Sequence, residues 1–243
     1  MKIMIEIKDL TIGFDGNNVL ENINFNIHKN NITIIVGQSG CGKSVLVKTI
    51  EGLYKPLNGK VIIDGYDVFS LKRKQLQQIR RKLTMLFQGS ALLDSLNVYQ
   101  NVSLPLFEHT EFSEKDIYDI VTEKLELVGL KDILYKMPSE LSGGMKKRVA
   151  LARAIILHPE YIIYDEPTTG LDPIIADEIN KLILKLYKNF KIAPIIITHD
   201  FDCIKKIGGK IVMIHDKKII FDGTLSDYKN SHDPRIRKFQ GKY

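Results

Sequence analysis

The fold of this 243-residue chain is decided by the stretch Gly37-Gln38-Ser39-Gly40-Cys41-Gly42-Lys43-Ser44. A glycine, four residues and then Gly-Lys-Ser are typical of a phosphate-binding loop. The glycines allow a tight turn whose successive backbone N–H groups point inward at an anion. Residues 31–36 before the loop are rich in Ile and predict a short buried strand. Residues 43–52 after it predict a helix, whose N-terminal dipole favours a bound phosphate.

The loop predicts ATP and Mg²⁺ as cofactors. Lys43 can reach the β- and γ-phosphates, and the Ser44 hydroxyl can ligate Mg²⁺. Cys41 is interpreted as a small residue that a tight loop tolerates, not as a redox centre. The predicted nucleotide contacts in this segment are Gly37, Gln38, Ser39, Gly40, Cys41, Gly42, Lys43, Ser44 and Val45.

A second pair of candidate residues follows another buried strand. Residues 161–164 are mostly apolar and lead directly into Asp165 and Glu166. Asp165 can hold Mg²⁺ through water, and Glu166 can polarise an attacking water molecule. Phosphoryl transfer depends on positioning and charge neutralisation more than on covalent chemistry, so an acid beside the metal-binding acid is the expected arrangement.

The order of the predicted elements indicates an α/β fold. Short buried strands alternate with helices, which favours a largely parallel sheet with its motifs just after strand ends. Residues 3–31 alternate polar and apolar side chains, typical of antiparallel strands. Helical periodicity predicts an inserted helical subdomain at about 90–157 and a basic tail at about 226–243, all within one domain, 1–243. Further predicted elements are short strands at 61–63 and Val68, a helix at 177–189, a strand at 195–198 and a hairpin at 211–214 with 218–221.

Composition narrows the function classes. The chain has 35 basic and 29 acidic residues, a formal charge of +6, and no stacking aromatics between its basic clusters, so we expect no nucleic-acid partner. No apolar run approaches the roughly 20 residues that a spanning helix needs, and the N-terminus does not resemble a signal peptide. The only cysteines, Cys41 and Cys203, lack metal-ligand spacing and predict no disulfide framework.

The stretch Leu141-Ser142-Gly143-Gly144-Met145 resembles the signature motif of ABC ATPases. The resemblance covers essentially the whole chain and implies a P-loop NTPase of the ABC ATPase type: a RecA-like core, an N-terminal antiparallel β subdomain and an inserted α-helical subdomain. Other positions match the family one by one. Phe14 resembles the aromatic residue that packs on adenine, Gln88 the Q-loop glutamine, Gly170-Leu171-Asp172 the D-loop, and His199 the switch histidine.

The resemblance also implies how the site works. In the family, the signature of one subunit meets the γ-phosphate held by the other, so the expected partner is a second copy of the chain. Ser142 opens a helix whose N-terminus can bind phosphate. The implied catalytic residues are Lys43, Gln88, Glu166 and His199, and the implied metal ligands are Ser44, Gln88 and Asp165. Nucleotide contacts are added by Phe14, Ser142, Gly143, Gly144 and Asp172.

A narrower resemblance depends on three stretches: Phe87-Gln88-Gly89-Ser90-Ala91-Leu92-Leu93-Asp94-Ser95-Leu96-Asn97-Val98, then Asn101-Val102 with Leu104-Pro105-Leu106, and Asp233-Pro234-Arg235-Ile236-Arg237-Lys238-Phe239. They look like the ATPases of Mla-type phospholipid transport systems, as does Met145 where the signature usually ends in Gln. This implies a peripheral subunit on the cytoplasmic face of the inner membrane, with an integral-membrane permease and an MCE-domain lipid-binding protein as partners. The D-loop segment has the general ABC form and does not support the lipid class specifically.

Two alternatives stay open from the sequence. One is a soluble, non-transport ABC ATPase of the iron–sulfur assembly type, which is similar in size. The other is the ATPase of an importer for amino acids or another small solute. ABC translation factors carry two cassettes in one chain, and ABC repair ATPases carry long insertions, neither of which is visible here.

Overall fold

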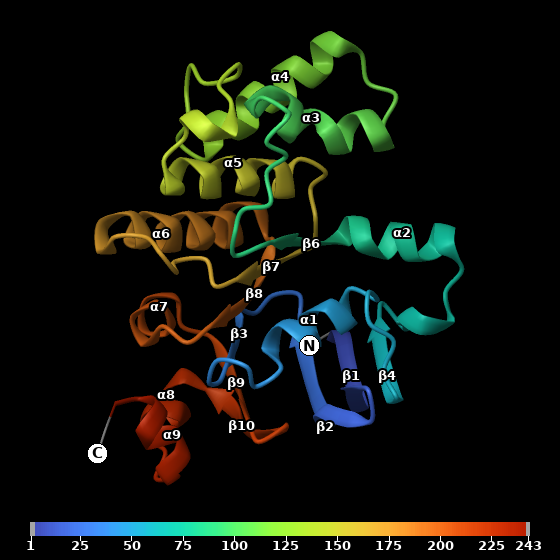
Figure 1. Ribbon diagram of the computed structural model, residues 1–243, viewed down its shortest axis with the longest axis vertical. Coiled ribbons are helices and arrows are strands. Elements are labelled where there is room, and N and C mark those ends of the chain that lie inside the picture. Colours follow the sequence, from blue (N-terminus) through green and yellow to red (C-terminus); the bar gives the residue numbers. More distant parts are fainter. Residues whose placement is uncertain (1–2, 242–243) are drawn as a thin grey trace.

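The computed structural model describes residues 3–241 and contains two sheets and a helical layer (Figure 1). The smaller sheet has the strand order β2-β1-β4-β5 and is antiparallel throughout. Its strands are β1 (Ile3–Phe14), β2 (Asn17–His28), β4 (Asn58–Ile63) and β5 (Tyr66–Asp67). The predicted antiparallel subdomain is therefore present. Two of its four strands, β4 and β5, follow the phosphate-binding loop in the sequence, because β4 pairs with the edge of β1 that β2 leaves free.

The larger sheet has the order β10-β9-β3-β8-β7-β6. Five of its strands run parallel, and only β10 pairs antiparallel, with β9. The strands are β3 (Thr33–Val36), β6 (Leu83–Leu86), β7 (Tyr161–Asp165), β8 (Ala193–Thr198), β9 (Lys210–His215) and β10 (Lys218–Thr224). Every residue of β3 and β8 is buried, as expected for parallel strands covered on both faces. This confirms the largely parallel sheet; β6 was not predicted.

The two faces of the larger sheet belong to different cores. Side chains alternate along a strand, so Ile34 and Val36 point to one face and Ile35 to the other. Ile34 and Val36 pack into the cluster that contains the inserted helices, whereas Ile35 packs into the cluster shared with the antiparallel sheet. The short strand β3 thus packs against both cores, and this packing holds the start of the phosphate-binding loop that follows it.

The helices cover the sheets and form a separate lobe (Figure 1). The lobe consists of α3 (Val98–His109), α4 (Glu114–Leu127) and α5 (Gly143–Ile155), with the short 3-10 turn η2 (Pro138–Glu140) before α5. Outside the lobe lie α1 (Lys43–Ile50), α2 (Arg73–Lys82), α6 (Pro173–Phe190) and α7 (Phe201–Ile207), besides two short helices near the C-terminus; α2 and α7 were not predicted. No helix within residues 3–241 is both long and apolar enough to cross a membrane.

Two local details differ from the sequence-based expectation. Val68 lies in the 3-10 turn η1 (Val68–Ser70) instead of a strand, because the Asp67 carboxylate accepts a hydrogen bond from the Phe69 N–H at 3.1 Å. The basic tail predicted at about 226–243 forms α8 (Leu225–Lys229) and α9 (Pro234–Phe239), which bury Tyr228 and Ile236. The last two residues of that tail, 242–243, lie outside the described residues.

Candidate nucleotide site

The phosphate-binding loop connects β3 to α1 in a conformation that only glycine adopts readily. Gly42 is the N-cap of α1 and has φ 101°, and a Cβ there would lie 2.9 Å from the Leu20 side chain. At Gly37, φ is 157° and a Cβ would lie 2.6 Å from the Ile214 carbonyl oxygen. The glycine spacing seen in the sequence is therefore required by both the backbone angles and the close packing of β2 and β9.

Lys43 is folded back onto its own loop. The residue is 7% exposed, and its Nζ donates to the Gly37 and Gln38 carbonyl oxygens at 2.8 Å each. A buried ammonium requires such partners, because removal from water disfavours an unpaired charge. The side chain therefore places a positive charge inside the loop that the sequence identifies as the phosphate cradle.

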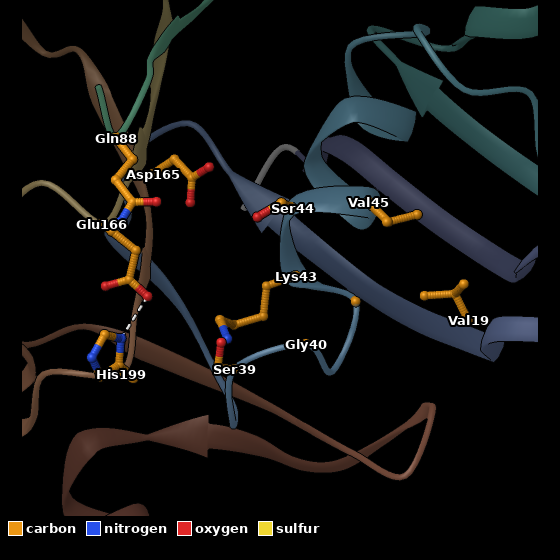
Figure 2. Close-up of a pocket in the computed structure, with 11 residues that line it drawn as sticks. Val19, Ser39, Gly40, Lys43, Ser44, Val45, Gln88, Asp165, Glu166 and His199 are labelled. Carbon is orange, nitrogen blue, oxygen red and sulfur yellow. Dashed lines mark hydrogen bonds and ion pairs between the residues drawn. The ribbon is translucent and has the colours of Figure 1, made fainter. Parts of the chain in front are cut away.

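The two acids at the end of β7, Asp165 and Glu166, face this loop (Figure 2). Burial, together with the nearby Glu166 charge, raises the pKa of Asp165, while Lys43, Lys48 and a hydrogen bond with Ser44 act in the opposite direction. Two neighbouring carboxyl groups that repel each other in a partly buried site are an arrangement that a divalent cation stabilises. Hydroxyl and carboxylate oxygens are also the ligands that Mg²⁺ prefers.

The Glu166 carboxylate is held in place by three side chains. Its Oε1 lies 2.7 Å from His199 Nδ1, and its Oε2 accepts hydrogen bonds from the Thr169 hydroxyl at 3.0 Å and the Thr198 hydroxyl at 3.4 Å. The backbone of Glu166 has φ 49°, an uncommon value for a non-glycine residue. Its N–H donates to the Ile197 carbonyl oxygen at 2.9 Å, which helps to hold this conformation. Strained backbone at the end of a strand is characteristic of functional sites.

The predicted residues from four separate segments meet in one cavity of about 280 Å³ (Figure 2). It is lined by Val19, Ser39, Gly40, Gly42, Lys43, Ser44, Val45, Gln88, Asp165, Glu166 and His199. Within residues 3–241, no group of three or more His, Cys, Asp or Glu side chains could hold a metal ion by itself. A Mg²⁺ site here would thus depend on Ser44, Asp165 and Gln88 together with phosphate oxygens, which is the usual way that proteins bind this ion.

Some predicted nucleotide contacts lie outside this cavity. Gln38 and Cys41 line an adjacent hollow of about 400 Å³ next to the β9–β10 turn. Phe14 is 44% exposed at the end of β1, and its ring packs edge-to-face against Tyr54, with centroids 5.3 Å apart. An exposed aromatic ring can stack on a base.

The signature residues and Asp172 form a second group away from the cavity. Ser142 is the exposed N-cap of α5, and its hydroxyl accepts a hydrogen bond from the Met145 N–H at 3.3 Å. A Cβ on Gly144 would lie 2.7 Å from Ile175, so this glycine allows α5 to approach α6. The Asp172 carboxylate caps α6, accepting from the Ile174 and Ile175 N–H groups at 3.0 Å each. The structure thus gives Asp172 a role in capping a helix and does not bring this group to the chain's own phosphate-binding loop.

Sequence reasoning missed several residues of the site. Thr169 and Thr198 hold Glu166, Val19 lines the cavity, and Tyr54 packs on Phe14. Lys147 was also missed, although it falls on the same helical stripe as the buried residues Gly144, Leu151 and Ala154. A lysine in an otherwise buried stripe of a helix was the signal that could have identified it.

Comparison with known proteins decides the family. Residues 20–169, more than half of the chain, match the ABC transporter family. The chain belongs to this family. The MlaF protein of Haemophilus influenzae, named as the ATP-binding protein of an intermembrane phospholipid transport system, is 40% identical over 97% of this chain and 89% of its own length. The MlaF protein of Escherichia coli K12 is 36% identical over 97% of this chain and 88% of its own length. A Mycobacterium leprae protein named as a probable ribonucleotide transport ATP-binding protein, mkl, is 38% identical over 98% of this chain and 69% of its own length.

Solved ABC cassettes share the fold. The cassette MJ0796, in a dimeric post-hydrolysis state with ADP and Pi, superposes with a TM-score of 0.83 at 31% identity, covering 91% of this chain and 99% of that one. The CbiO1 protein of Clostridium perfringens, part of the ABC transporter complex CbiONQ, superposes with a TM-score of 0.87 at 29% identity over 99% of this chain and 100% of its own. The chain is an ATP-binding subunit of an ABC transporter.

Proposed function

We propose that this ABC subunit hydrolyses ATP as a homodimer and thereby drives phospholipid transport between envelope membranes, together with a permease and an MCE-domain protein. The observation that carries the lipid class is the 40% identity to a phospholipid-transport ATPase across 97% of the chain. The observation that supports hydrolysis is the cavity in which Lys43, Asp165 and Glu166 face one another.

Each side chain of the site has a proposed role in the reaction. Lys43 neutralises charge on the β- and γ-phosphates, and the glycine-rich backbone holds them in place. Glu166 accepts a proton from the attacking water as general base, and His199, 2.7 Å from its carboxylate, orients it. Mg²⁺, held by Ser44 and Asp165 with Gln88 beside them, would supply charge neutralisation at the phosphates.

The homodimer is supported by the separation of the two groups of site residues. Ser142, Gly143, Gly144 and Asp172 do not line the cavity that contains Lys43 and Glu166. A second copy of the chain can supply its exposed α5 N-terminus to the nucleotide, because helix N-termini bind phosphate. The dimeric state of the MJ0796 cassette is consistent with this arrangement.

The permease is proposed to dock beside residues 88–105 and to recruit the subunit to the cytoplasmic face of the inner membrane. Within and beside this stretch, Leu93 is 45% exposed and Phe87 is 39% exposed. Exposed large apolar side chains of this kind can be covered by a protein partner.

A reconstitution experiment tests the proposal. The subunit would be co-expressed with candidate permease and MCE proteins, purified from detergent extract and placed in proteoliposomes. We expect a stable complex and ATP-dependent transfer of labelled phospholipid to acceptor vesicles, abolished in the Glu166→Gln complex. An active ATPase complex that transfers no phospholipid would contradict the lipid assignment.

A solute importer is the second candidate, favoured by the 38% identity to the probable ribonucleotide transport protein mkl. The same proteoliposomes can be loaded or bathed with labelled ribonucleotides. ATP-dependent ribonucleotide movement without phospholipid transfer would select this candidate.

A further inference from the structure

Lys147 on α5 is a buried cation that neither the phosphate-binding loop nor the signature accounts for. It is 5% exposed, and within residues 3–241 no carboxylate forms an ion pair with its Nζ. Burying an ammonium group costs several kcal/mol unless its partners compensate. Burial lowers the pKa of Lys147, and the nearby Asp165 and Glu166 charges act in the opposite direction.

The partners of Lys147 are backbone groups at the catalytic edge of the sheet. Its Nζ donates to the Gln88 carbonyl oxygen at 2.6 Å and has a longer contact, 3.5 Å, with the Glu166 carbonyl oxygen. Gln88 follows β6 and Glu166 follows β7, and the paired ladder between these strands ends at Leu86 and Tyr164. The ammonium therefore joins the two segments that follow β6 and β7, at the point where the direct pairing of these strands has stopped.

The same helix holds the next residues of this segment as well. The Arg153 guanidinium donates to the Ser90 carbonyl oxygen at 3.1 Å and the Ala91 carbonyl oxygen at 2.8 Å. Ser90 and Ala91 have φ values of 65° and 46°, a left-handed conformation that needs outside support. Residues 88–91 are thus attached to α5 at two points, and the N-cap of α5 is Ser142.

We propose that Lys147 is a positioning residue, whose buried ammonium joins the Gln88 and Glu166 carbonyl groups and so fixes these two site residues relative to the helix that carries the signature. The inference rests on the proposed ATP hydrolysis. It assigns no contact with nucleotide to Lys147. Its effect reaches the reaction through the backbone of Gln88 and Glu166, and displacement of a catalytic group by about 1 Å can lower a rate on the order of 100-fold.

Lys147→Met tests this role, because Met has a similar length but no donor and no charge. We expect kcat for ATP to fall on the order of 10- to 100-fold, with the Kd for a fluorescent ATP analogue within about twofold of wild type. The melting temperature should change little, because removing the desolvation cost of the buried ammonium offsets the hydrogen bonds that the two carbonyl groups lose. Lys146→Met, at the neighbouring and less buried position, is the matched control and should keep wild-type kcat.

Two further measurements separate positioning from a general structural role. Lys147→Arg restores a charge and two donors, and its kcat should return to within about threefold of wild type. Amide hydrogen exchange in peptides spanning 87–93 and 164–170 should be faster in Lys147→Met and unchanged in Lys146→Met, because local opening raises exchange.

The following results would overturn the proposal. They are wild-type kcat in Lys147→Met, a loss of nucleotide affinity in step with kcat, or an Arg variant that is folded but as slow as the Met variant. If Lys147→Met does not fold, Lys147→Leu, which also has no donor and no charge, takes its place under the same criteria. Failure of both to fold would make Lys147 a structural residue. A wild-type chain without ATPase activity would overturn the proposed function together with this inference, whereas an active wild type and an equally active Met variant would overturn the inference alone.

Discussion

Two helices of this protein begin with glycine-rich segments, but they present their N-termini in opposite ways. At α1, the N-cap Gly42 is left-handed and has no side-chain cap, so the N–H groups of the first turn stay available inside a cavity of about 280 Å³. At α5, the N-cap Ser142 bonds the Met145 N–H, and the segment is exposed on the surface. The start of α1 therefore shares a cavity with a lysine and two carboxylates of its own chain. The start of α5 faces solvent and does not line this cavity.

This difference supports the proposal that one chain contains only part of the reaction site. The cavity beside α1 contains the residues proposed to hold the phosphates and to position the attacking water. The α5 segment has the same helix N-terminus chemistry, but its contribution requires a nucleotide brought by another copy. Substitutions in α1 and α5 should therefore affect ATP binding and ATP hydrolysis differently.

The largest effect is expected from Lys43→Ala, which removes the cation that is folded into the phosphate-binding loop. ATP binding and hydrolysis should be nearly abolished, with the rate lowered on the order of 1,000-fold, because the β- and γ-phosphates lose their charged partner. Titration with a fluorescent ATP analogue and steady-state phosphate release would measure both. Lys55→Ala, an exposed lysine beyond the same helix, is the control, and unchanged turnover in Lys43→Ala would remove this loop from the site.

Glu166→Gln should separate ATP binding from ATP hydrolysis at the cavity beside α1. Gln keeps the size and one acceptor oxygen but loses the negative charge, so hydrolysis should slow by about 10²–10⁴-fold while ATP still binds. The variant should accumulate as an ATP-bound dimer, detectable by size-exclusion chromatography with light scattering at high concentration. ADP in place of ATP is the control. A monomer with ATP, or a wild-type rate, would contradict the role of Glu166.

Ser142→Arg tests the second segment. ATP binding to the monomer should stay nearly intact and hydrolysis should stop, because the long side chain obstructs the phosphate of the other copy. Loss of the N-cap should also destabilise the chain by about 1 kcal/mol, or roughly 2–4 °C in melting temperature. Ser139→Arg, three residues earlier and exposed, is the control for the added charge.

Mixing the two inactive variants sharpens the comparison further. A dimer of one Lys43→Ala chain and one Ser142→Arg chain contains one site with both changes and one site with neither. Partial recovery of phosphate release on mixing is therefore expected if α1 and α5 of different chains share a nucleotide. No recovery at concentrations where Glu166→Gln dimerises would indicate that each chain works alone.

The smallest effect is expected at the far end of α1, where Glu51 is the C-cap. Burial raises its pKa to about 7, with Asp165 adding to the shift and with Arg80 and Lys48 opposing it. A carboxyl whose folded pKa exceeds its unfolded value binds its proton more tightly when folded, so this site loses stability as pH rises from about 4.5 through 7. Glu51→Gln should thus raise the melting temperature at pH 8 by roughly 2–8 °C and have little effect at pH 5. The exposed Glu111→Gln is the control, and an equal shift at both pH values would contradict this account.

The sequence predicted the parts of the site that depend on contiguous residues. The glycine spacing of 37–44 dictates a loop conformation, Ser142 caps its helix, and the buried run before Asp165 forms a strand, as the structure confirms. These features follow from local backbone angles and from hydrogen bonds between residues a few positions apart, so a short window of sequence contains them. The strand β6 was missed because its four residues have no periodicity of their own and are defined by pairing with β7, more than 70 positions away.

Only the tertiary structure decided which distant residues share a contact. Lys147 reaches Gln88 across 59 positions, and His199 reaches Glu166 across 33. Val68 turned out to lie in a 3-10 turn because of the Asp67 side chain, and Asp172 is occupied in capping α6. Sequence alone determined that this chain binds ATP as an ABC subunit, since the phosphate cradle is made of consecutive residues. How its acids are oriented and how α5 is joined to them depended on the packing of the lobe against the sheet, because a buried cation and a strained carboxylate are stable only where separate segments supply their partners.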